Sequence, residues 1–366
     1  MAYVVLLVLA ALDSAGYSII APVIPEIGDA TGSGPGLMGV LVASFALGQA
    51  AGYPLAGRGI QRRHAISVLA VSLGLVVVGD LGFIVGGGLG VYFPARLLQG
   101  VGAGGLWMGV SFAVIERFPG QEFRRLTGIL AAYGVGAIAG PAMGGAGGIR
   151  TPFAIHLGLV VPIALALLLV GAPTKRAQFT SDRRALSSAG FWLASAGVLL
   201  VALTLGTFDG PLPIHFSQHL TQAQIAALYV VAAVVAAVCA TLAGSLAPRP
   251  VLAVSAVIMP AAIALGGLSE NIPIWVFVAV LVGVGIGAGE AGALGVLLES
   301  IGVERIVLAM VVWSQVWALG YIAGPAAGGG IAEALGFGAI GIVPLAPALL
   351  VAGMFAATFR SRRATA

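Results

Sequence analysis

The chain has 366 residues, of which 60% are hydrophobic and only 8% are charged, and its net charge is +4. Soluble globular domains carry about 25% charged residues, so this composition excludes an ordinary soluble protein. The single cysteine, Cys239, excludes an intrachain disulfide and a metal cluster built from cysteines. The 56 glycines fit closely packed membrane helices, whose backbones approach where residues are small.

Apolar runs long enough to span a bilayer, about 20 residues each, occur twelve times along the chain. They predict an all-α membrane protein with twelve transmembrane helices, at 2–24, 37–57, 65–85, 89–115, 124–147, 152–172, 187–212, 222–245, 250–268, 272–298, 305–332 and 335–359. No basic leader precedes the first run, so we expect a retained helix rather than a cleaved signal peptide. The longest polar connection, 173–186, is predicted to link a six-helix half at 1–172 to another at 187–366.

The basic residues are distributed unevenly between the two sides of this predicted topology. With the N-terminus inside, 15 of the 17 lysines and arginines fall on the inner side, Arg150 falls on the outer side and Arg96 lies within a helix. Basic residues collect on the cytoplasmic side of membrane proteins. We therefore expect both termini and the linker to be cytoplasmic, and the positive charge to be a topology signal rather than a nucleic-acid surface.

Short motifs repeat between the two halves. "IAGPAMGG" at 138–145 recurs as "IAGPAAGG" at 322–329, and "GVGAG" at 100–104 recurs as "GVGIG" at 283–287. Each copy falls on the matching helix of its half, and six helices per half keep both copies in the same orientation. The sequence therefore predicts a parallel repeat, and transporters built this way bind substrate near the midplane between the repeats.

Two segments have patterns typical of one transporter family, "RLLQGVGAG" (96–104) and "GVGAIAGPAMGG" (134–145). They resemble the major facilitator superfamily, and in particular its drug:proton antiporter branch. Four further segments are similar to vesicular amine transporters and their bacterial relatives within that branch: "LDSAGYSIIAPVIP" (12–25), "FDGPLPI" (208–214), "GIGAGEAG" (285–292) and "GYIAGPAAGG" (320–329). The resemblance covers essentially the whole chain and implies two six-helix halves that give a substrate access to alternate sides of the membrane.

Two acidic residues fall near the middle of predicted spans. Asp13 lies in the first run and Glu290 in the tenth. An Asp at a helix centre costs about 2.5–3.5 kcal/mol on insertion scales, and such residues usually face the bundle interior. One carboxyl group can bind either a proton or a cation, which is the simplest physical basis for antiport. We therefore predict that Asp13 and Glu290 couple protons and bind substrate; a paired structural carboxylate is the alternative for each.

The resemblance supplies further candidates for the site. It implies that Arg96 takes part in proton coupling, although an arginine that snorkels to the interface is the alternative reading. Gln99 lies on the same helix face and could share either role. For an organic amine, the resemblance and the aromatic residues within the spans add four predicted substrate-binding residues, Asp209, Tyr229, Trp317 and Tyr321.

A second group of motif residues is predicted to serve gating and helix packing. The family's loop after its second helix resembles "YPLAGRGIQRR" at 53–63, in which Arg58 is present but Gly57 replaces the usual acid. The remaining members of the group are Gly140, Pro141, Gly144, Gly324, Pro325 and Gly328. Two isolated polar residues within spans, Asp80 and His156, are more simply explained as structural.

The sequence predicts a proton-coupled exporter of small organic cations or lipophilic drugs; the alternative is an exporter or facilitator of neutral metabolites such as sugars. No phosphate-binding loop with its Lys-Ser/Thr pair occurs, and no metal-ligand cluster suggests an enzyme. We expect no cofactor, no metal, no nucleic-acid partner, and a monomer that spans the inner (plasma) membrane several times. Its partners would be a small-molecule substrate, protons and the lipid bilayer.

Overall fold

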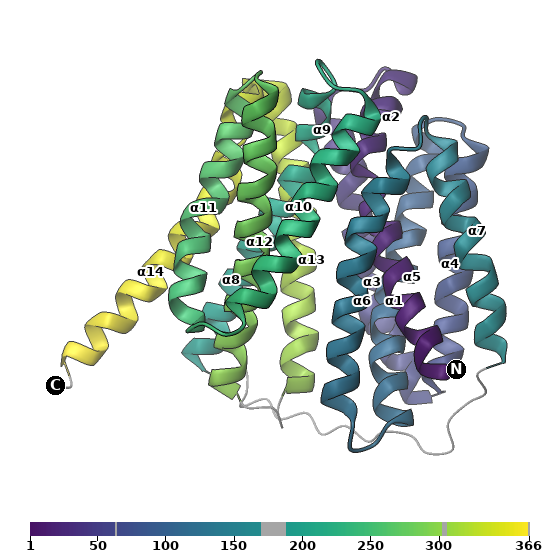
Figure 1. Cartoon of the computed structure of the whole chain (residues 1–366), viewed down its shortest axis with the longest axis horizontal. Coiled ribbons are helices and arrows are strands. Elements are labelled where there is room, and N and C mark those ends of the chain that lie inside the picture. The colour runs from purple at the N-terminus through teal and green to yellow at the C-terminus, as the bar shows by residue number, and fades with distance from the viewer. Residues whose placement is uncertain (63, 170–187, 302–305, 365–366) are drawn as a thin grey trace. The chain divides into compact units, whose positions relative to one another are not determined.

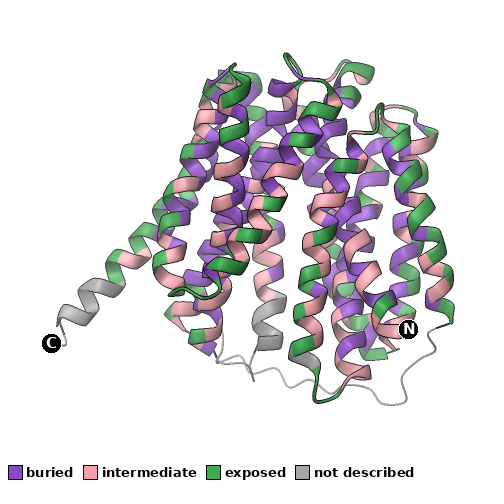
Figure 2. Cartoon of the chain, viewed as in Figure 1, coloured by how far each residue is buried: buried purple, intermediate pink, exposed green. Residues whose placement is uncertain are grey.

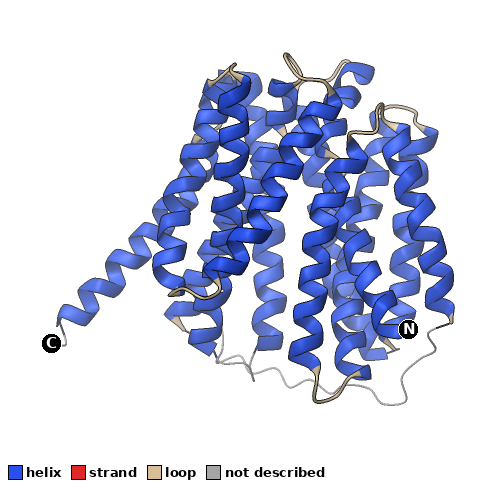
Figure 3. Cartoon of the chain, viewed as in Figure 1, coloured by secondary structure: helices blue, strands red, loops and turns tan. Residues whose placement is uncertain are grey.

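The computed structural model describes residues 1–62, 64–169, 188–301 and 306–364. Helices and short connections account for all of these residues, and Figure 3 shows no strand among them. The predicted linker 173–186 lies outside the described residues. Contacts divide the chain into two units, Met1–Phe179 with Phe216–Val230, and Thr180–His215 with Val231–Ala366.

The first unit is built around two central helices, α1 and α5. Helix α1 packs against α5, α6 and α7, and α5 packs against α3 and α4 (Figure 1). The helical segments of this unit are α1 (Ala2–Ser18), η1 (Ala21–Val23), α2 (Ile24–Thr31), α3 (Pro35–Arg62), α4 (Ala65–Val85), α5 (Leu89–Arg117), α6 (Glu122–Gly144) and α7 (Arg150–Leu168).

The second unit is organised around α8, which packs against α11, α12, α13 and α14. Its segments are α8 (Ala189–Asp209), α9 (Pro211–Phe216), α11 (Pro248–Leu268), α12 (Ile272–Ile301), α13 (Ile306–Leu335), η4 (Phe337–Ala339) and α14 (Ile342–Ala364). Helix α10 (Gln222–Ala243) contributes its first part to the first unit and its remainder to the second.

The predicted spans match these helices closely, and 65–85 coincides with α4. Two helices differ from the predicted spans. The second predicted helix ends at residue 57, whereas α3 continues to Arg62, so most of the stretch assigned to a loop is helical. The sequence between these points contains no proline and has no residue that requires a left-handed backbone, so nothing stops the helix.

The first predicted span is interrupted where a single helix was expected. Helix α1 ends at Ser18, and the chain continues through the 3-10 turn η1 into the separate helix α2. Pro22 and Pro25 explain the break, because proline has no N–H to donate to the carbonyl group four residues earlier. The carbonyl groups at the end of α1 therefore need other partners.

Each unit contains a ladder of glycines that lets two helices pack at backbone distance. A Cβ built on Gly136 or Gly140 of α6 would collide with a backbone carbonyl oxygen of α1, and one built on Gly144 would press against that of Ile19, the residue that follows α1. In the second unit, Gly320 and Gly324 of α13 meet carbonyl oxygens of α8 in the same way. The "GPxxGG" motif is therefore a helix-packing element in both units, as small residues are in membrane bundles.

Eleven helical stretches in the described part of the chain are long and apolar enough to cross a membrane. Helix α13 is also 30 residues long. Large apolar side chains lie exposed along one face of α4, where Val71, Val78 and Val85 are 65%, 53% and 71% exposed. Figure 2 shows the buried residues in purple and the exposed residues in green on the helices. Such a face would be unfavourable in water and is suited to contact with lipid.

Candidate functional site

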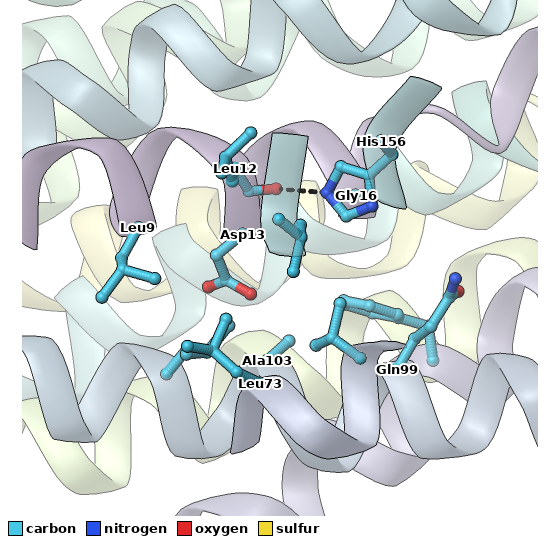
Figure 4. A pocket seen from close by; sticks show the side chains of 12 residues that line it. Leu9, Leu12, Asp13, Gly16, Leu73, Gln99, Ala103 and His156 are labelled. Atoms are coloured by element: carbon cyan, nitrogen blue, oxygen red, sulfur yellow. Dashed lines mark hydrogen bonds between the residues drawn. The ribbon is translucent and has the colours of Figure 1, made fainter. Parts of the chain in front are cut away.

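Asp13 is buried in the last third of α1, where its side chain is 8% exposed. The hydroxyl group of Tyr133, on α6, donates a hydrogen bond to its Oδ2. The carboxyl group points toward Leu73 of α4 and Ala103 of α5, into a small cavity between the helices (Figure 4). This cavity is mostly apolar, has room for about one water molecule, and has Gln99 and His156 as its other polar lining residues.

Arg96 is fully buried and binds the broken end of the first span. Its Nη1 donates to the carbonyl oxygen of Gly16 at 3.1 Å, and its Nη2 donates to that of Tyr17 at 2.8 Å. These are two of the carbonyl groups that the end of α1 leaves without helical partners. The positive charge also complements the negative end of the helix dipole. The guanidinium group lies 4.3 Å from the centre of the Phe45 ring.

A chain of polar side chains continues from Arg96 across the first unit. Nη1 of Arg96 donates to Gln99 Oε1 at 3.0 Å, and Gln99 Nε2 donates to Asp80 Oδ1 at 2.7 Å. The second oxygen of Asp80 lies 2.8 Å from Nδ1 of His156 on α7. His156 Nε2 lies 3.0 Å from the carbonyl oxygen of Leu12, which brings the chain back to α1 (Figure 4). All four side chains are buried.

The second unit brings together three other predicted residues. The hydroxyl group of Tyr321 on α13 donates to Asp209 Oδ2 at 2.7 Å, and both side chains are buried. The ring of Trp317 stacks on Tyr321, with centroids 5.2 Å apart and planes inclined by 6°. Asp209 is the last residue of α8, and its side chain is buried. In both units, a tyrosine on the glycine-ladder helix thus donates to a carboxylate on the helix against which that ladder packs.

Glu290 and Tyr229 do not join either of these clusters. Glu290 lies in α12 with an exposed side chain, and no hydrogen bond or ion pair to it occurs among the described residues. Tyr229 is buried in α10, in the segment that belongs to the first unit.

The predicted packing residues are placed as follows. Gly140 and Gly144 contact α1, and Gly324 contacts α8, at distances that leave no room for a side chain. A Cβ on Gly328 would lie 3.1 Å from the Thr207 methyl group. Pro141 lies within α6 and Pro325 within α13, next to the glycines. Arg58 is exposed near the end of α3.

Sequence reasoning missed three residues of the first-unit site. The sequence gives Tyr133 no role of its own, and it predicts no partner for Asp80 or His156. The pair could have been predicted, because burying a single acid or a single histidine in an apolar span is unfavourable in free energy, and pairing the two reduces that cost. No group of three or more His, Cys, Asp or Glu side chains positioned to hold a metal ion occurs within the described ranges.

Two curated proteins of Bacillus subtilis (strain 168) are similar to the chain. It is 27% identical over 237 residues to Multidrug resistance protein 2, and the alignment covers 59% of each chain. It is 24% identical over 213 residues to the uncharacterized MFS-type transporter YfiU, covering 57% of this chain and 40% of the relative. The chain thus spans 59% and 40% of the lengths of these relatives.

The structure is similar to two solved structures of a bacterial homolog of the human lysosomal transporter Spinster. The inward-facing, unoccupied form has a TM-score of 0.73 at 14% identity and covers 96% of this chain and 95% of that one. The inward-facing, occupied form has a TM-score of 0.67 at 15% identity and covers 96% of both chains. At these identities the likeness establishes the fold. Residues 6–249, more than half of the chain, match the Major Facilitator Superfamily, and the chain belongs to that family.

Proposed function

We propose that this protein is a proton-coupled secondary active transporter that exports small organic cations or lipophilic drugs by alternating access. Members of its family are membrane transporters and not enzymes. The observation that carries the proposal is Asp13, a buried carboxyl group in an apolar span, facing a cavity and hydrogen-bonded to a single tyrosine.

The chemistry of a buried carboxyl group supports exchange. An ionisable residue at membrane depth is expensive, and it is typical of ion and substrate pathways. Burial disfavours the charged form of a carboxyl group, whereas a nearby cation favours it. A proton and a cationic substrate therefore compete for the same group. Arg96 stays charged throughout, because arginine does not lose its proton in proteins; its proposed part in coupling is to hold α1 around Asp13.

The second unit supports a cationic substrate. Trp317 and Tyr321 form a stacked aromatic pair beside the Asp209 carboxylate. A cation over an aromatic face gains about 0.5–2 kcal/mol, and an adjacent carboxylate adds to the attraction. We propose that these residues, with Tyr229 and Gln99, contribute to substrate binding. The exposed carboxylate of Glu290 is the proposed second site for protons and substrate.

The curated relative named Multidrug resistance protein 2 supports drug export as the direction of transport. We further propose that both termini are cytoplasmic, because the basic residues gather on that side of the predicted topology. On this assignment Arg58 lies at the inner side, where it serves the inner gate. The proposed location is the bacterial inner membrane, and the proposed state is a monomer.

The proposal is tested by proton-gradient-driven uptake into inverted membrane vesicles, with a panel of organic amines and cationic dyes. We expect uptake of at least one cation that collapses when the gradient is dissipated. Gradient-dependent movement of a neutral sugar alone would replace the proposal with the neutral-metabolite alternative. Absence of gradient-dependent movement of every cation would reject the antiport of cations.

A matched pair of variants tests Asp13. Asp13→Asn keeps the shape of the side chain but cannot exchange a proton, so coupled uptake should fall at least about tenfold, as when a group that acts directly is lost. Asp29→Asn is the control, because Asp29 is exposed at the end of α2. Unchanged coupled uptake and unchanged pH dependence in Asp13→Asn would show that Asp13 does not couple protons.

A further inference from the structure

The buried pair of Asp80 and His156 is not used by the function proposed above. Asp80 comes from α4 and His156 from α7, both residues are buried, and Oδ2 lies 2.8 Å from Nδ1. Buried charges at membrane depth usually have partners and usually have a role. The chemistry of this pair depends on which of its oxygen and nitrogen atoms carry protons.

The hydrogen-bond partners fix the donors and acceptors along the chain. The carbonyl oxygen of Leu12 can only accept, so Nε2 of His156 must carry a proton. Arg96 can only donate, so Gln99 presents Oε1 to Arg96 and its amide nitrogen to Asp80. Asp80 Oδ1 thus accepts a hydrogen bond.

The remaining contact joins Asp80 Oδ2 to Nδ1 of His156. A carboxylate there requires Nδ1 to donate, and the ring then carries protons on both nitrogens. An ion pair of this kind satisfies both partners at a buried site. We propose that Asp80 and His156 form a second proton-binding site, with Asp80 ionised and His156 doubly protonated, which is coupled to Asp13 through α1.

The exchangeable proton of this site is the one on Nε2. Loss of the Nδ1 proton would place a nitrogen lone pair against the Asp80 carboxylate. Loss of the Nε2 proton to water breaks one N–H bond and leaves a neutral ring that still donates to Asp80. Loss of this proton also removes the hydrogen bond from Nε2 to the carbonyl oxygen of Leu12, because the nitrogen lone pair then faces the oxygen lone pairs. His156 then no longer holds the α1 backbone next to Asp13.

The imidazole ring of His156 packs directly against the backbone of α1. A Cβ added to Gly16 would lie 2.7 Å from Cε1 of His156, so only glycine leaves the ring room to reach the backbone. The small cavity beside Asp13 is lined by both Gln99 and His156, and it can hold a water molecule to accept the proton.

Charge balance gives the sign of the coupling. Arg96 and His156 carry two positive charges, and Asp80 and ionised Asp13 carry two negative charges. When Asp13 takes up a proton, one positive charge is left over in a low-dielectric interior, so release of the Nε2 proton becomes easier. Helix α7, which carries the ring, packs against α1, α4 and α6. Besides the charged residues in the first turn of α6, these helices carry the titratable groups Tyr3, Asp13 and Tyr17 on α1, Asp80 on α4 and Tyr133 on α6. Arg96 of α5 reaches the ring through Gln99 and Asp80.

Nitrogen NMR of the whole chain with ¹⁵N-labelled histidine tests the site without any transport. The His156 signals are assigned by their absence in His156→Gln, with His219→Gln at an exposed position as the matched control. We expect His156 to carry both protons at pH 7. In Asp13→Asn the second proton should be lost at a pH lower by about one unit, because a neighbouring negative charge is gone. Asp29→Asn should leave it unchanged.

Two results would overturn the proposal: a singly protonated His156 at pH 7, or a titration that is the same in the wild type and Asp13→Asn. Asp80→Asn adds an independent arm, in which His156 should lose its second proton at pH 7. The link to transport rests on the function proposed above, but the NMR result does not. A protonated and coupled His156 in a protein that moves no cation would reject the antiport and retain the site.

Discussion

Replacing Arg96 with lysine keeps the buried positive charge but removes the planar fork that carries it. Arg96 donates from Nη1 to Gly16 and Gln99, and from Nη2 to Tyr17. A lysine has one nitrogen at the end of a flexible stem, so it cannot reach both α1 carbonyl groups and Gln99 together. We expect Arg96→Lys to leave about two of the three hydrogen bonds unmade.

The size of the effect follows from these contacts. Hydrogen bonds to charged groups contribute about 1.5–3 kcal/mol each, and the new ammonium contact recovers part of the loss. A net loss of about 3 kcal/mol is the expected result. One kcal/mol lowers the melting temperature by about 2–4 °C in a cooperative unit of about 150–250 residues, so the drop should be roughly 6–12 °C.

The measurement is the apparent melting temperature in detergent, followed by fluorescence-detected size exclusion after heating. Arg58→Lys is the matched control, because it is the same substitution at an exposed position of α3, and it should melt with the wild type. A melting temperature for Arg96→Lys within about 2 °C of the control would refute the conclusion that Arg96 holds the end of α1.

Three further predictions concern other parts of the fold. Gly140→Leu should abolish the folded protein in the same assay, because the leucine side chain would collide with the α1 backbone. Gly134→Leu is the control and should fold normally, because a Cβ at Gly134 meets nothing within 4 Å. Equal folding of the two variants would contradict the glycine ladder. Tyr321→Phe should cost about 1.5–3 kcal/mol because Asp209 loses a charge-assisted hydrogen bond, and an unchanged melting temperature would rule out that bond. In a cysteine-free background, Glu290→Cys should react with a water-soluble maleimide, because an exposed carboxylate in a span faces a water-filled space rather than lipid. Complete protection of this cysteine from the maleimide would place residue 290 against lipid.

The sequence is a good guide to the helices because length and hydropathy alone determine a membrane span. Helix α4 begins and ends where its apolar run does. The break in the first span was readable in principle from Pro22 and Pro25, but the apolar run continues through both and conceals it. The glycine motif predicted a packing role, and repeated small residues four apart are sufficient for that inference.

The polar network was less predictable for a physical reason. Asp80 and His156 are 76 positions apart, and nothing in a linear pattern states which helix faces meet. Asp13 and Arg96 stand out in the sequence because a charged residue within an apolar span is exceptional on its own. Tyr133 was not singled out, because a tyrosine in a span is ordinary until the carboxylate it contacts is known.

The break in the first span divides it into two helices joined by a short 3-10 turn. Because Pro22 and Pro25 interrupt the backbone hydrogen bonds there, α2 can tilt without unwinding the turn that carries Asp13. The position of that turn is set instead from other helices, by Arg96 at the end of α1 and by His156 at Leu12. The helix beyond the break is not one of these anchors, so a change at Arg96 or His156 would act more directly on the turn that carries Asp13 than a change in α2.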